Sequence, residues 1–581
     1  MTTHNTTSAS STYHPLPPVR PNTKPLFPVT SKSQNKLPFP SPLNSRKFKE
    51  LLYDYPCHDF PELLANIIDF GAKIGYTGPN GAIRTPNHSS ARTEPTVIEK
   101  DINSDLELSR LIQIPSLPQH HFCSPLGLTP KTNNGCHTGW RRIFDLSCPA
   151  GKSVNDGIEP TFGELKYETF DAALQEIAKL GKGTVMMKRD IKSAFRHIPI
   201  STEDHHLLIF EWKEKFYVDL FLPFGLRTAP FIFNLFAEAL HWILQRKYSW
   251  ILHHYLDDFI IFFPAGTSID KAHLKFKSTC TQLGFMLAKE KDIQGTVVDY
   301  LGLILDSDKM EARLPPNKKD RVISEVTYLL AKKSPVTRAN LQSVLGFLTF
   351  CTRVFPLGRP FLRHLFNMLS RTHKPQRLTL AARRDLIWWK TLLPLWSGIS
   401  AIAPKRQEIT IATDASGRKG IGGIWLKPMK MFSTRMPRRH RTKHINYKEM
   451  FAILYAFAEW CDDWKGQSVN IHCDNDAVVK GVNKSTIRGA AIHPLQSLLL
   501  LAATRDIVVR ATWIPTKENA IADALSRFDM KRLANLVGVQ GISIPQSRQP
   551  SQISKKISLL KQTITYSTAC QNLTEPKSPL Q

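Results

Sequence analysis

The sequence lacks several features that define whole classes of proteins. Its nine cysteines form no Cys-x-x-Cys pair and no His/Cys cluster with zinc spacing, which argues against a zinc module or a disulfide scaffold. No apolar run approaches the roughly 18 residues of a membrane span, and the polar start at Met1 to Asn5 holds no signal-peptide core. We therefore expect a soluble protein inside the cell, in the cytoplasm, the nucleus or both, with reduced thiols and no membrane partner.

Acidic residues are scarce relative to basic ones. The 581-residue chain has 77 Lys and Arg against 49 Asp and Glu, a formal net charge of +28. This balance favours a polyanionic partner held by salt-sensitive contacts, although many solvated surfaces are also basic. The length exceeds one compact domain, and 42% hydrophobic residues can bury the cores of three or four.

Two adjacent carboxylates, Asp257 and Asp258, interrupt an apolar, aromatic-rich stretch from His253 to Phe263 that predicts a β-hairpin. Buried acids without basic neighbours are costly, so these two either stand in water at a turn or hold a cation. Asp190 closes another apolar strand, 257 − 190 = 67 residues earlier. The three could hold two Mg²⁺ ions, with Mn²⁺ as an alternative, about 4 Å apart. That arrangement activates a 3′-hydroxyl and stabilises a leaving pyrophosphate.

These motifs resemble a known family in type and order. Tyr255-Leu256-Asp257-Asp258 after Asp190 is similar to motifs C and A of reverse transcriptases, and Leu222 to Asn234 resembles motif B of retroelement polymerases. The resemblance implies an α+β right-hand polymerase with fingers, palm and thumb. It also implies an RNA template, a DNA primer and dNTPs as partners, with the three aspartates as catalytic metal ligands.

The same resemblance assigns the substrate contacts. Arg141, in a Trp-Arg-x-x-x-Asp motif, would grip the triphosphate with two donors, and Lys131 would assist it. Phe195 would stack under the sugar and exclude a 2′-hydroxyl, and Gly225 would let template and base approach the backbone. Lys291 resembles the motif D lysine that donates a proton near the pyrophosphate. The alternatives are that Arg141 and Arg142 simply flank an exposed strand, that Phe195 packs in the core and that Lys291 lies on the surface.

A second acidic set follows near Gln407. Two alternating strands end in Asp414 and Asp474, Glu449 falls in the predicted first turn of a helix, and Asp523 comes after a last stretch from Ala511 to Asn519. Four carboxylates at separate element ends are what a second two-metal site requires, here for attack of water on a phosphodiester.

This order resembles the α/β ribonuclease H-like domain of retroelements. The resemblance implies Mg²⁺-dependent cleavage of RNA in RNA-DNA hybrids, with Asp414, Glu449, Asp474 and Asp523 as catalytic metal ligands. Related enzymes often carry a His where this chain has Lys517, which leaves product release or proton transfer open. A basic loop from Arg435 to Arg441 has three interpretations: a grip on the hybrid backbone, a nuclear signal, or solvated charge.

Composition and motifs together predict the domain organisation. We expect a disordered arm at 1–45, an N-terminal helical region at 46–120, fingers and palm at 121–310, thumb and connection at 311–403, the ribonuclease H-like domain at 404–530 and a basic, mostly disordered tail at 531–581. Within the N-terminal region, one helix is expected from Ile98 to Ile112, and in the thumb a helical pattern runs from Arg338 to Leu369.

The N-terminal pattern resembles the region before the fingers in the tyrosine-recombinase (DIRS) group of retrotransposons. The sequence has no Asp-Thr-Gly or Asp-Ser-Gly protease signature, which also favours this group over gypsy-like elements. Two other interpretations stay open. One is a pararetrovirus-type polymerase. The other is a decayed or domesticated copy that only binds nucleic acid, against which the seven intact carboxylates argue. The sequence leaves priming mode and oligomeric state undetermined.

Overall fold

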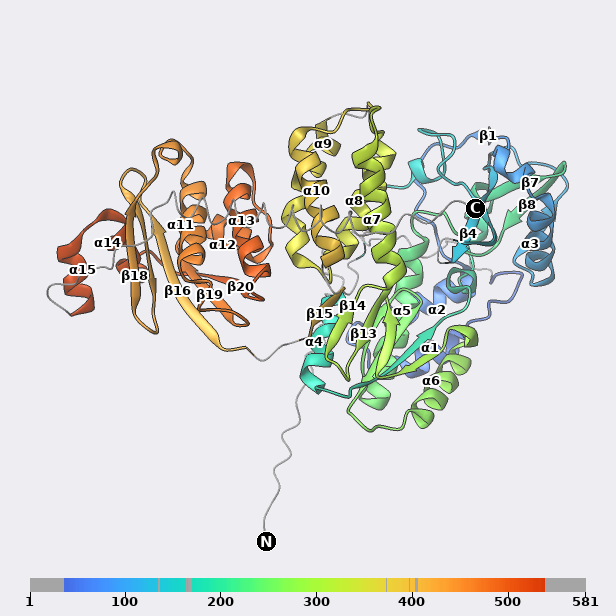
Figure 1. Ribbon diagram of the computed structural model, residues 1–581. Helices are drawn as coiled ribbons and strands as arrows, with labels where there is room; N and C mark the ends of the chain where they lie inside the picture. Colours follow the sequence, from blue (N-terminus) through green and yellow to red (C-terminus); the bar gives the residue numbers. More distant parts are fainter. Residues whose placement is uncertain are drawn as a thin grey trace, which may run out of the picture. The chain divides into compact units, whose positions relative to one another are not determined.

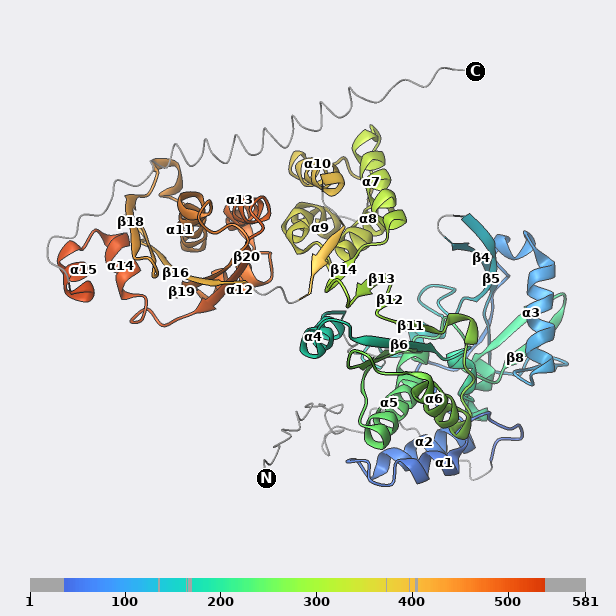
Figure 2. The ribbon, with the colours of Figure 1, turned by 60° about the horizontal axis from the view of Figure 1, so that its bottom comes forward.

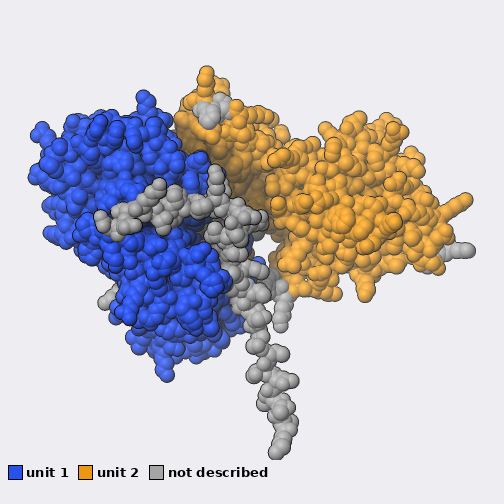
Figure 3. All heavy atoms as spheres, turned by 180° about the vertical axis from the view of Figure 1, so that it is seen from behind, with its two compact units in different colours: residues 1–310 blue, residues 311–581 orange. Residues whose placement is uncertain are grey.

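The computed structural model describes residues 36–133, 136–162, 165, 170–371, 374–395, 398–402 and 406–538. The chain divides into two compact units, residues 1–310 and 311–581, which are coloured separately in Figure 3. Most of the predicted arm, up to residue 35, and the tail from residue 539 lie outside the described residues. In the part of the chain that the structure describes, no helix is both long and apolar enough to cross a membrane.

Unit 1 contains six helices and thirteen strands among its described residues (Figure 1). The helices are α1 (Ser45–Leu51), α2 (Asp59–Phe70), α3 (Pro95–Glu107), α4 (Phe170–Leu180), α5 (Ala229–Tyr248) and α6 (Asp270–Leu283). The strands are β1 (Ala82–Arg84), β2 (Leu111–Ile114), β3 (His121–Cys123), β4 (Leu126–Asn133), β5 (Cys136–Phe144), β6 (Val185–Asp190), β7 (Ile209–Trp212), β8 (Lys215–Asp219), β9 (Ile251–Tyr255), β10 (Asp258–Phe263), β11 (Ile293–Gly295), β12 (Val297–Tyr300) and β13 (Leu303–Asp306).

The sheet that positions the first acidic set has the strand order β11-β6-β10-β9. Its central strand β10 is a continuous apolar run in which Phe259, Ile260 and Ile261 are fully buried. Such a run indicates a strand covered on both faces. Other strands of unit 1 form a five-stranded sheet of order β1-β3-β7-β8-β2, and β4 pairs with β5 as a hairpin.

The N-terminal helices belong to the core of unit 1. Phe48 of α1 meets Phe236 of α5 edge to face, with ring centroids 5.5 Å apart, and Phe285 at 6.0 Å. The backbone N–H of Asn44 donates to the carbonyl of Leu283 over 3.0 Å, and Leu43 is buried. Residues 36–45, which the sequence assigns to the disordered arm, are therefore ordered against this core.

One predicted helix is shorter than expected. The helix expected from Ile98 to Ile112 ends at Glu107 as α3. Ser109 adopts a left-handed conformation with φ of +53°, which turns the chain out of the helix. Leu111 and the three residues after it then pair with β8 as an edge strand, because their backbone groups find partners there.

Unit 2 begins with helices and a strand pair and continues into a five-stranded sheet. The helices are α7 (Pro316–Ala331), α8 (Arg338–Cys351), α9 (Arg363–Arg371), α10 (Leu380–Leu395), α11 (Ile445–Trp460), α12 (Asp476–Asn483), α13 (Ile492–Ala503), α14 (Ala520–Arg527) and α15 (Met530–Val537). The strands are β14 (Glu311–Arg313), β15 (Ile399–Ala401), β16 (Glu408–Ala415), β17 (Gly420–Trp425), β18 (Lys430–Arg435), β19 (Ser468–Cys473) and β20 (Val508–Trp513). The helical pattern expected from Arg338 to Leu369 is divided between α8 and α9 by a 3₁₀ segment that contains Pro356 and Pro360, since proline removes a helical hydrogen bond.

The sheet of unit 2 has the order β18-β17-β16-β19-β20. β16, β17 and β18 are antiparallel, whereas β16, β19 and β20 are parallel. Figure 2 shows α11 and α13 together on one side of this sheet. Ile411 packs in the core that includes α11, and its neighbour Ala412 packs with Leu525 of α14. Because successive strand residues point to opposite faces, α11 and α14 cover opposite faces of the sheet. The core that includes α11 contains only unit 2 residues, and the core around Phe48 and Phe236 only unit 1 residues.

Candidate active sites

The three carboxylates of the first set lie at one end of neighbouring strands. Asp190 is the last residue of β6, and its register partner across the antiparallel pair is Asp258, the first residue of β10. Asp257 occupies the β9–β10 turn, after Leu256 at φ of +55°. The backbone N–H of Ile191 donates to the carbonyl of Asp257 over 3.1 Å, which joins the turn to the end of β6. The structure therefore brings together the three acids that the sequence singles out.

The charges in this cluster are not balanced. Burial, together with the charges of Asp190 and Asp258, raises the pKa of Asp257 to about 6. Burial also raises the pKa of Asp258, although Lys188 lies 3.5 Å from its carboxylate. Lys291 donates to Oδ2 of Asp190 over 2.9 Å. Burial opposes the charge of Lys291, but this hydrogen bond and the three carboxylates outweigh it and raise its pKa. Three acids facing two ammonium groups favour a further cation.

Sequence reasoning missed Lys188 as a member of this site. Lys188 lies two residues before Asp190 in β6, so both side chains point to the same face of the strand. The alternation of side chains along a strand was the signal that could have found it. Lys291, in contrast, was expected near the site, and the structure places it in contact with Asp190.

The predicted triphosphate contacts border a cavity of about 320 Å³. Lys131 of β4 and Arg141 of β5 line it together with Ser193 and Phe224. Phe195 contacts the exposed ring of Phe224, with centroids 5.0 Å apart. The cavity thus combines two exposed cations with aromatic surface, which suits an anionic, ring-bearing ligand.

The two neighbouring arginines of β5 have different surroundings. Arg142 donates to Oδ2 of Asp105 over 2.6 Å, and its side chain is mostly buried. Arg141 is exposed. Asp105 also faces Arg110 at 3.7 Å and Arg196 at 3.5 Å, so Arg142 belongs to a buried charge network. Arg141 is the arginine of the pair whose charge faces solvent.

Gly225 is explained by packing inside the protein. Its φ is +103°, and a Cβ built at this position would lie 2.5 Å from the carbonyl oxygen of Phe144. The side-chain amide of Asn155, in a 3₁₀ turn after β5, donates to the carbonyl of Gly225 over 2.8 Å and holds the loop there. This reason for glycine differs from the expected approach of template and base.

The four carboxylates of the second set come from both strands and helices of unit 2. Asp414 lies near the end of β16, and Asp474 directly follows the parallel neighbour β19. Glu449 lies one turn inside α11, because the helix begins at Ile445; the predicted first-turn position was wrong. Donor atoms of Glu449, Cys473 and Asp474 all lie within 4.8 Å of one another. Asp523 lies in α14.

Burial dominates the electrostatics of this set. It raises the pKa of Glu449 well above its ordinary value, and the charges of Asp414 and Asp474 raise it further. It also raises the pKa of Asp414 to about 6, even though the Ser526 hydroxyl donates to that carboxylate. Oε2 of Glu449 is buried and has no hydrogen-bond partner among the described residues. An unpartnered buried carboxylate oxygen beside other acids is suited to a bound cation.

Several residues that the sequence analysis did not name hold these acids. Arg527 and Arg532 each donate to Asp523 over 2.6 Å, one to each oxygen. The Thr516 hydroxyl donates to Oδ2 of Asp474 over 2.8 Å, and the indole N–H of Trp513 donates to its carbonyl over 3.0 Å. Lys517 is exposed in the loop between β20 and α14.

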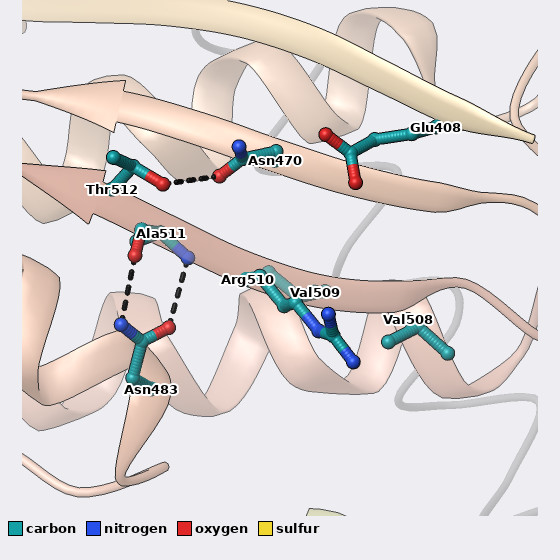
Figure 4. Close-up of a pocket in the computed structure, with 8 residues that line it drawn as sticks. All are labelled: Glu408, Asn470, Asn483, Val508, Val509, Arg510, Ala511 and Thr512. Carbon is teal, nitrogen blue, oxygen red and sulfur yellow. Dashed lines mark hydrogen bonds between the residues drawn. The ribbon is translucent and has the colours of Figure 1, made fainter. Parts of the chain in front are cut away.

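A separate cavity of about 540 Å³ lies beside β19 and β20 and contains none of the four acids (Figure 4). Asn483 of α12 donates to the carbonyl of Ala511 and accepts from its N–H, both over 2.8 Å. The Thr512 hydroxyl donates to the side-chain oxygen of Asn470 over 2.9 Å. Asn483 thus satisfies backbone groups of β20, and these polar groups have a structural role in the sheet.

Residues 131–305 match the family model described as reverse transcriptase (RNA-dependent DNA polymerase). This segment contains the first acidic set and its five predicted substrate residues. Unit 1 of this chain therefore carries a reverse transcriptase domain.

Curated relatives are retroelement and virus polyproteins. The Pol polyprotein of transposon gypsy from Drosophila melanogaster is 25% identical over 377 residues, which cover 62% of this chain and 34% of the relative. Polyprotein P3 of Commelina yellow mottle virus is 23% identical over 368 residues, 61% of this chain and 18% of the relative. The transposon Tf2-3 polyprotein of Schizosaccharomyces pombe is 22% identical over 379 residues, 61% of this chain and 26% of the relative. This chain spans about a third or less of each of these three proteins.

Among solved structures, the foamy viral protease-reverse transcriptase dRH in complex with double-stranded DNA has a TM-score of 0.45 and 17% identity. The match covers 84% of both chains.

Proposed function

We propose that this protein is an RNA-directed DNA polymerase of a retroelement that also has ribonuclease H activity. The observation that carries the polymerase proposal is the register pairing of Asp190 with Asp258, beside Asp257, inside the segment that matches the reverse transcriptase family. Its partners would be RNA and DNA templates, a DNA primer and dNTPs. We place its action in the cytoplasm, the nucleus or both.

The first acidic set fits divalent metal ions. Its donors are carboxylates, which Mg²⁺ and Mn²⁺ prefer, and burial with mutual repulsion raises the pKa of both Asp257 and Asp258. Bound there, two Mg²⁺ ions would activate the primer 3′-hydroxyl and stabilise the leaving pyrophosphate. Asp190, Asp257 and Asp258 would hold them.

The remaining residues would bind and orient the nucleotide. Arg141 and Lys131 would hold the triphosphate in the cavity they line, since their charges are exposed there. Phe195, which contacts Phe224 at the cavity wall, would support the sugar and exclude a 2′-hydroxyl. Gly225 would shape the loop beside the substrate, and Lys291 would give its Nζ proton to the leaving pyrophosphate.

The proposed ribonuclease H activity rests on unit 2. Asp414, Glu449, Asp474 and Asp523 would hold two further Mg²⁺ ions, and the unpartnered buried oxygen of Glu449 supports this assignment. The mixed sheet order β18-β17-β16-β19-β20, with three antiparallel and three parallel strands sharing β16, supports a ribonuclease H-like domain. Residues 311–403 would form the thumb and connection, and 404–530 the nuclease domain.

Primer extension on an RNA template with Mg²⁺ and dNTPs tests the polymerase. Wild type should extend the primer and Asp257→Asn should not, because the substitution removes a charged metal ligand. A hybrid with labelled RNA tests the nuclease in the same preparations: Asp474→Asn should abolish cleavage and leave extension intact. Each variant is the matched control for the other site.

The same experiment separates an active enzyme from a decayed copy. A folded wild type that binds hybrid but neither extends nor cleaves would establish a decayed nucleic-acid-binding protein. Both transposon and virus polyproteins are among the relatives, so a pararetrovirus-type polymerase stays the second candidate. Membership of the DIRS group is a proposal that rests on the N-terminal pattern and the missing protease signature.

A further inference from the structure

The residue before Asp190 has a side chain that points away from the acids. Along β6, Lys188 and Asp190 face the acidic cluster, so Arg189 faces the opposite side. Arg189 is only 1% exposed. A buried guanidinium requires several acceptors, and their identity shows what the residue holds.

The guanidinium of Arg189 is shared between two elements. Its Nε and Nη2 donate to Nδ1 of His273 in α6, over 3.1 and 2.9 Å. Its Nη1 donates to the carbonyl of Ile293 over 3.2 Å, and its Nη2 donates to Oε1 of Gln294 over 2.8 Å. The carboxylate of Asp292 lies 3.6 Å from Nε. Three of these partners, residues 292–294, directly follow Lys291.

The backbone pairing beside β6 shows how Arg189 can affect the position of Lys291. The N–H of Ala288 donates to the carbonyl of Asp190 over 3.0 Å, and Ile293 is the register partner of Lys188. Between these two positions, the four residues 289–292 stand opposite the single residue Arg189. These four residues bulge out of the strand pairing, with Lys289–Lys291 as a 3₁₀ turn. Lys291 therefore reaches Asp190 from a bulge whose base is held by Arg189.

We propose that Arg189 is a positioning residue for nucleotide transfer. It fixes the bulge at 289–292 so that Lys291 keeps its hydrogen bond to Asp190. This inference rests on the proposed polymerase function. Without the guanidinium, Ile293 and Gln294 lose their shared anchor, and the bulge is free to carry Nζ of Lys291 away from the cluster. Lysine cannot replace arginine here, because one ammonium does not supply donors in a planar fork.

A double-mutant cycle on the full chain tests the proposal. Single-turnover incorporation of one dNTP is measured for wild type, Arg189→Met, Lys291→Met and the double variant on the same primer-template. Loss of a general acid lowers rates by roughly 100-fold or more, and we expect Arg189→Met to approach the Lys291→Met rate. In the Lys291→Met background, Arg189→Met should change the rate by less than about twofold, because it acts through Lys291. Arg189→Lys should not restore the rate.

The melting temperature of each variant, which should stay above the assay temperature, checks that the protein is folded. The primer-template affinity is a second check and should not differ between Lys291→Met and the double variant. A cavity of about 530 Å³ borders Arg189, His273 and Gln294. Water can therefore reach the acceptors that lose their donor in Arg189→Met. If Arg189→Met does not fold, Gln294→Leu replaces it, since Gln294 is exposed. Gln282→Leu, at an exposed glutamine of α6, is its matched control.

The outcomes are distinct. Rate losses that multiply in the double variant, or an Arg189→Met rate equal to wild type, would overturn the positioning role and leave the polymerase function standing. If Gln294→Leu is used, a loss that persists in the Lys291→Met background has the same meaning. A wild type that does not extend primers would overturn the proposed function itself.

Discussion

Asp190 and Asp258 are register partners across β6 and β10, so one strand pair sets the separation of two of the three acids. The third, Asp257, is placed by the turn between β9 and β10 and is joined to β6 through the N–H of Ile191. Rigid strands therefore position this cluster, and a long flexible loop is not needed to assemble it.

The half-buried carboxylate of Asp257 should make metal-free protein less stable as pH rises. Its folded-state pKa of about 6 exceeds the ordinary 3.8, so the folded state holds the proton more tightly. That stabilisation is complete below pH 3.8 and is lost as pH rises to about 6, an effect of at most about 3 kcal/mol. In EDTA, the melting temperature of Asp257→Asn minus that of wild type should therefore increase from about pH 4 to about pH 6 and then level off.

Asp299→Asn, at an exposed carboxylate of β12, is the control for this experiment. A difference for Asp257→Asn that stays flat across the range would contradict the burial of its charge. Added Mg²⁺ should raise the melting temperature of wild type more than that of Asp257→Asn, because a ligand stabilises the state that binds it.

Arg141 and Arg142 should separate substrate binding from stability. Arg141→Ala should raise the KM for dNTPs roughly tenfold to a hundredfold at unchanged melting temperature, because charge-assisted hydrogen bonds contribute about 1.5–3 kcal/mol. Arg142→Ala should instead lower the free energy of unfolding by about 1–3 kcal/mol, since it leaves Asp105 with fewer partners. Steady-state kinetics and thermal melts on both variants check this. If the KM of Arg141→Ala for dNTPs equals that of wild type, Arg141 does not bind the nucleotide.

Gly225→Ala should destabilise unit 1 by about 2 kcal/mol or more. The substitution combines a positive φ with a contact of 2.5 Å to the backbone of β5, which has little room to move. Gly266→Ala is the matched control, because Gly266 has φ of +76° with nothing within 4 Å. Chemical denaturation should show a larger loss for Gly225→Ala, and the difference isolates the backbone contact. Equal losses would mean that φ alone requires glycine at 225.

Arg532→Ala should change the metal requirement of the nuclease. Arg527 and Arg532 each donate to one oxygen of Asp523, so both guanidinium groups compete with an ion for this carboxylate. We expect the Mg²⁺ concentration for half-maximal hybrid cleavage to fall in Arg532→Ala, since one competitor is gone. The Mg²⁺ dependence of primer extension should stay unchanged and is the internal control. A higher Mg²⁺ requirement for cleavage would show that Arg532 supports the site.

The sequence predicted those elements whose signal is local. The β9–β10 hairpin and the strand before Asp190 follow from apolar runs, and the strands that lead to Asp414 and Asp474 follow from alternation ended by an acid. The start of α11 was misplaced because Glu449 was taken as a first-turn acid, whereas the helix begins at Ile445 after the cap of His444. The end of α3 was missed because the conformation of Ser109 and the pairing of β2 with β8 depend on distant residues.

In the candidate sites, too, some features have a local signal in the sequence and others depend on distant residues. Five of the seven candidate acids stand out because they follow or end predicted strands, and Glu449 and Asp523 could be named because the order of motifs resembles a ribonuclease H-like domain. Their partners could not, because Ser526, Thr516 and Arg532 are ordinary residues until folding brings them to the acids. Arg189 is the clearest case: a basic residue beside a strand-end acid suggests a surface charge, and only the bulge at 289–292 reveals what it holds. The domain boundaries and the roles of the site residues remain predictions.

The acidic sets rest on hydrophobic cores that share no residue, one around Phe48 and Phe236 and one around Ile411 and α11. A substitution in one set therefore need not disturb the packing under the other. In genetic terms, Asp257→Asn and Asp474→Asn are expected to be separation-of-function alleles. Co-expressed in one cell, each allele supplies the activity that the other lacks, and the pair would complement in trans where neither suffices alone.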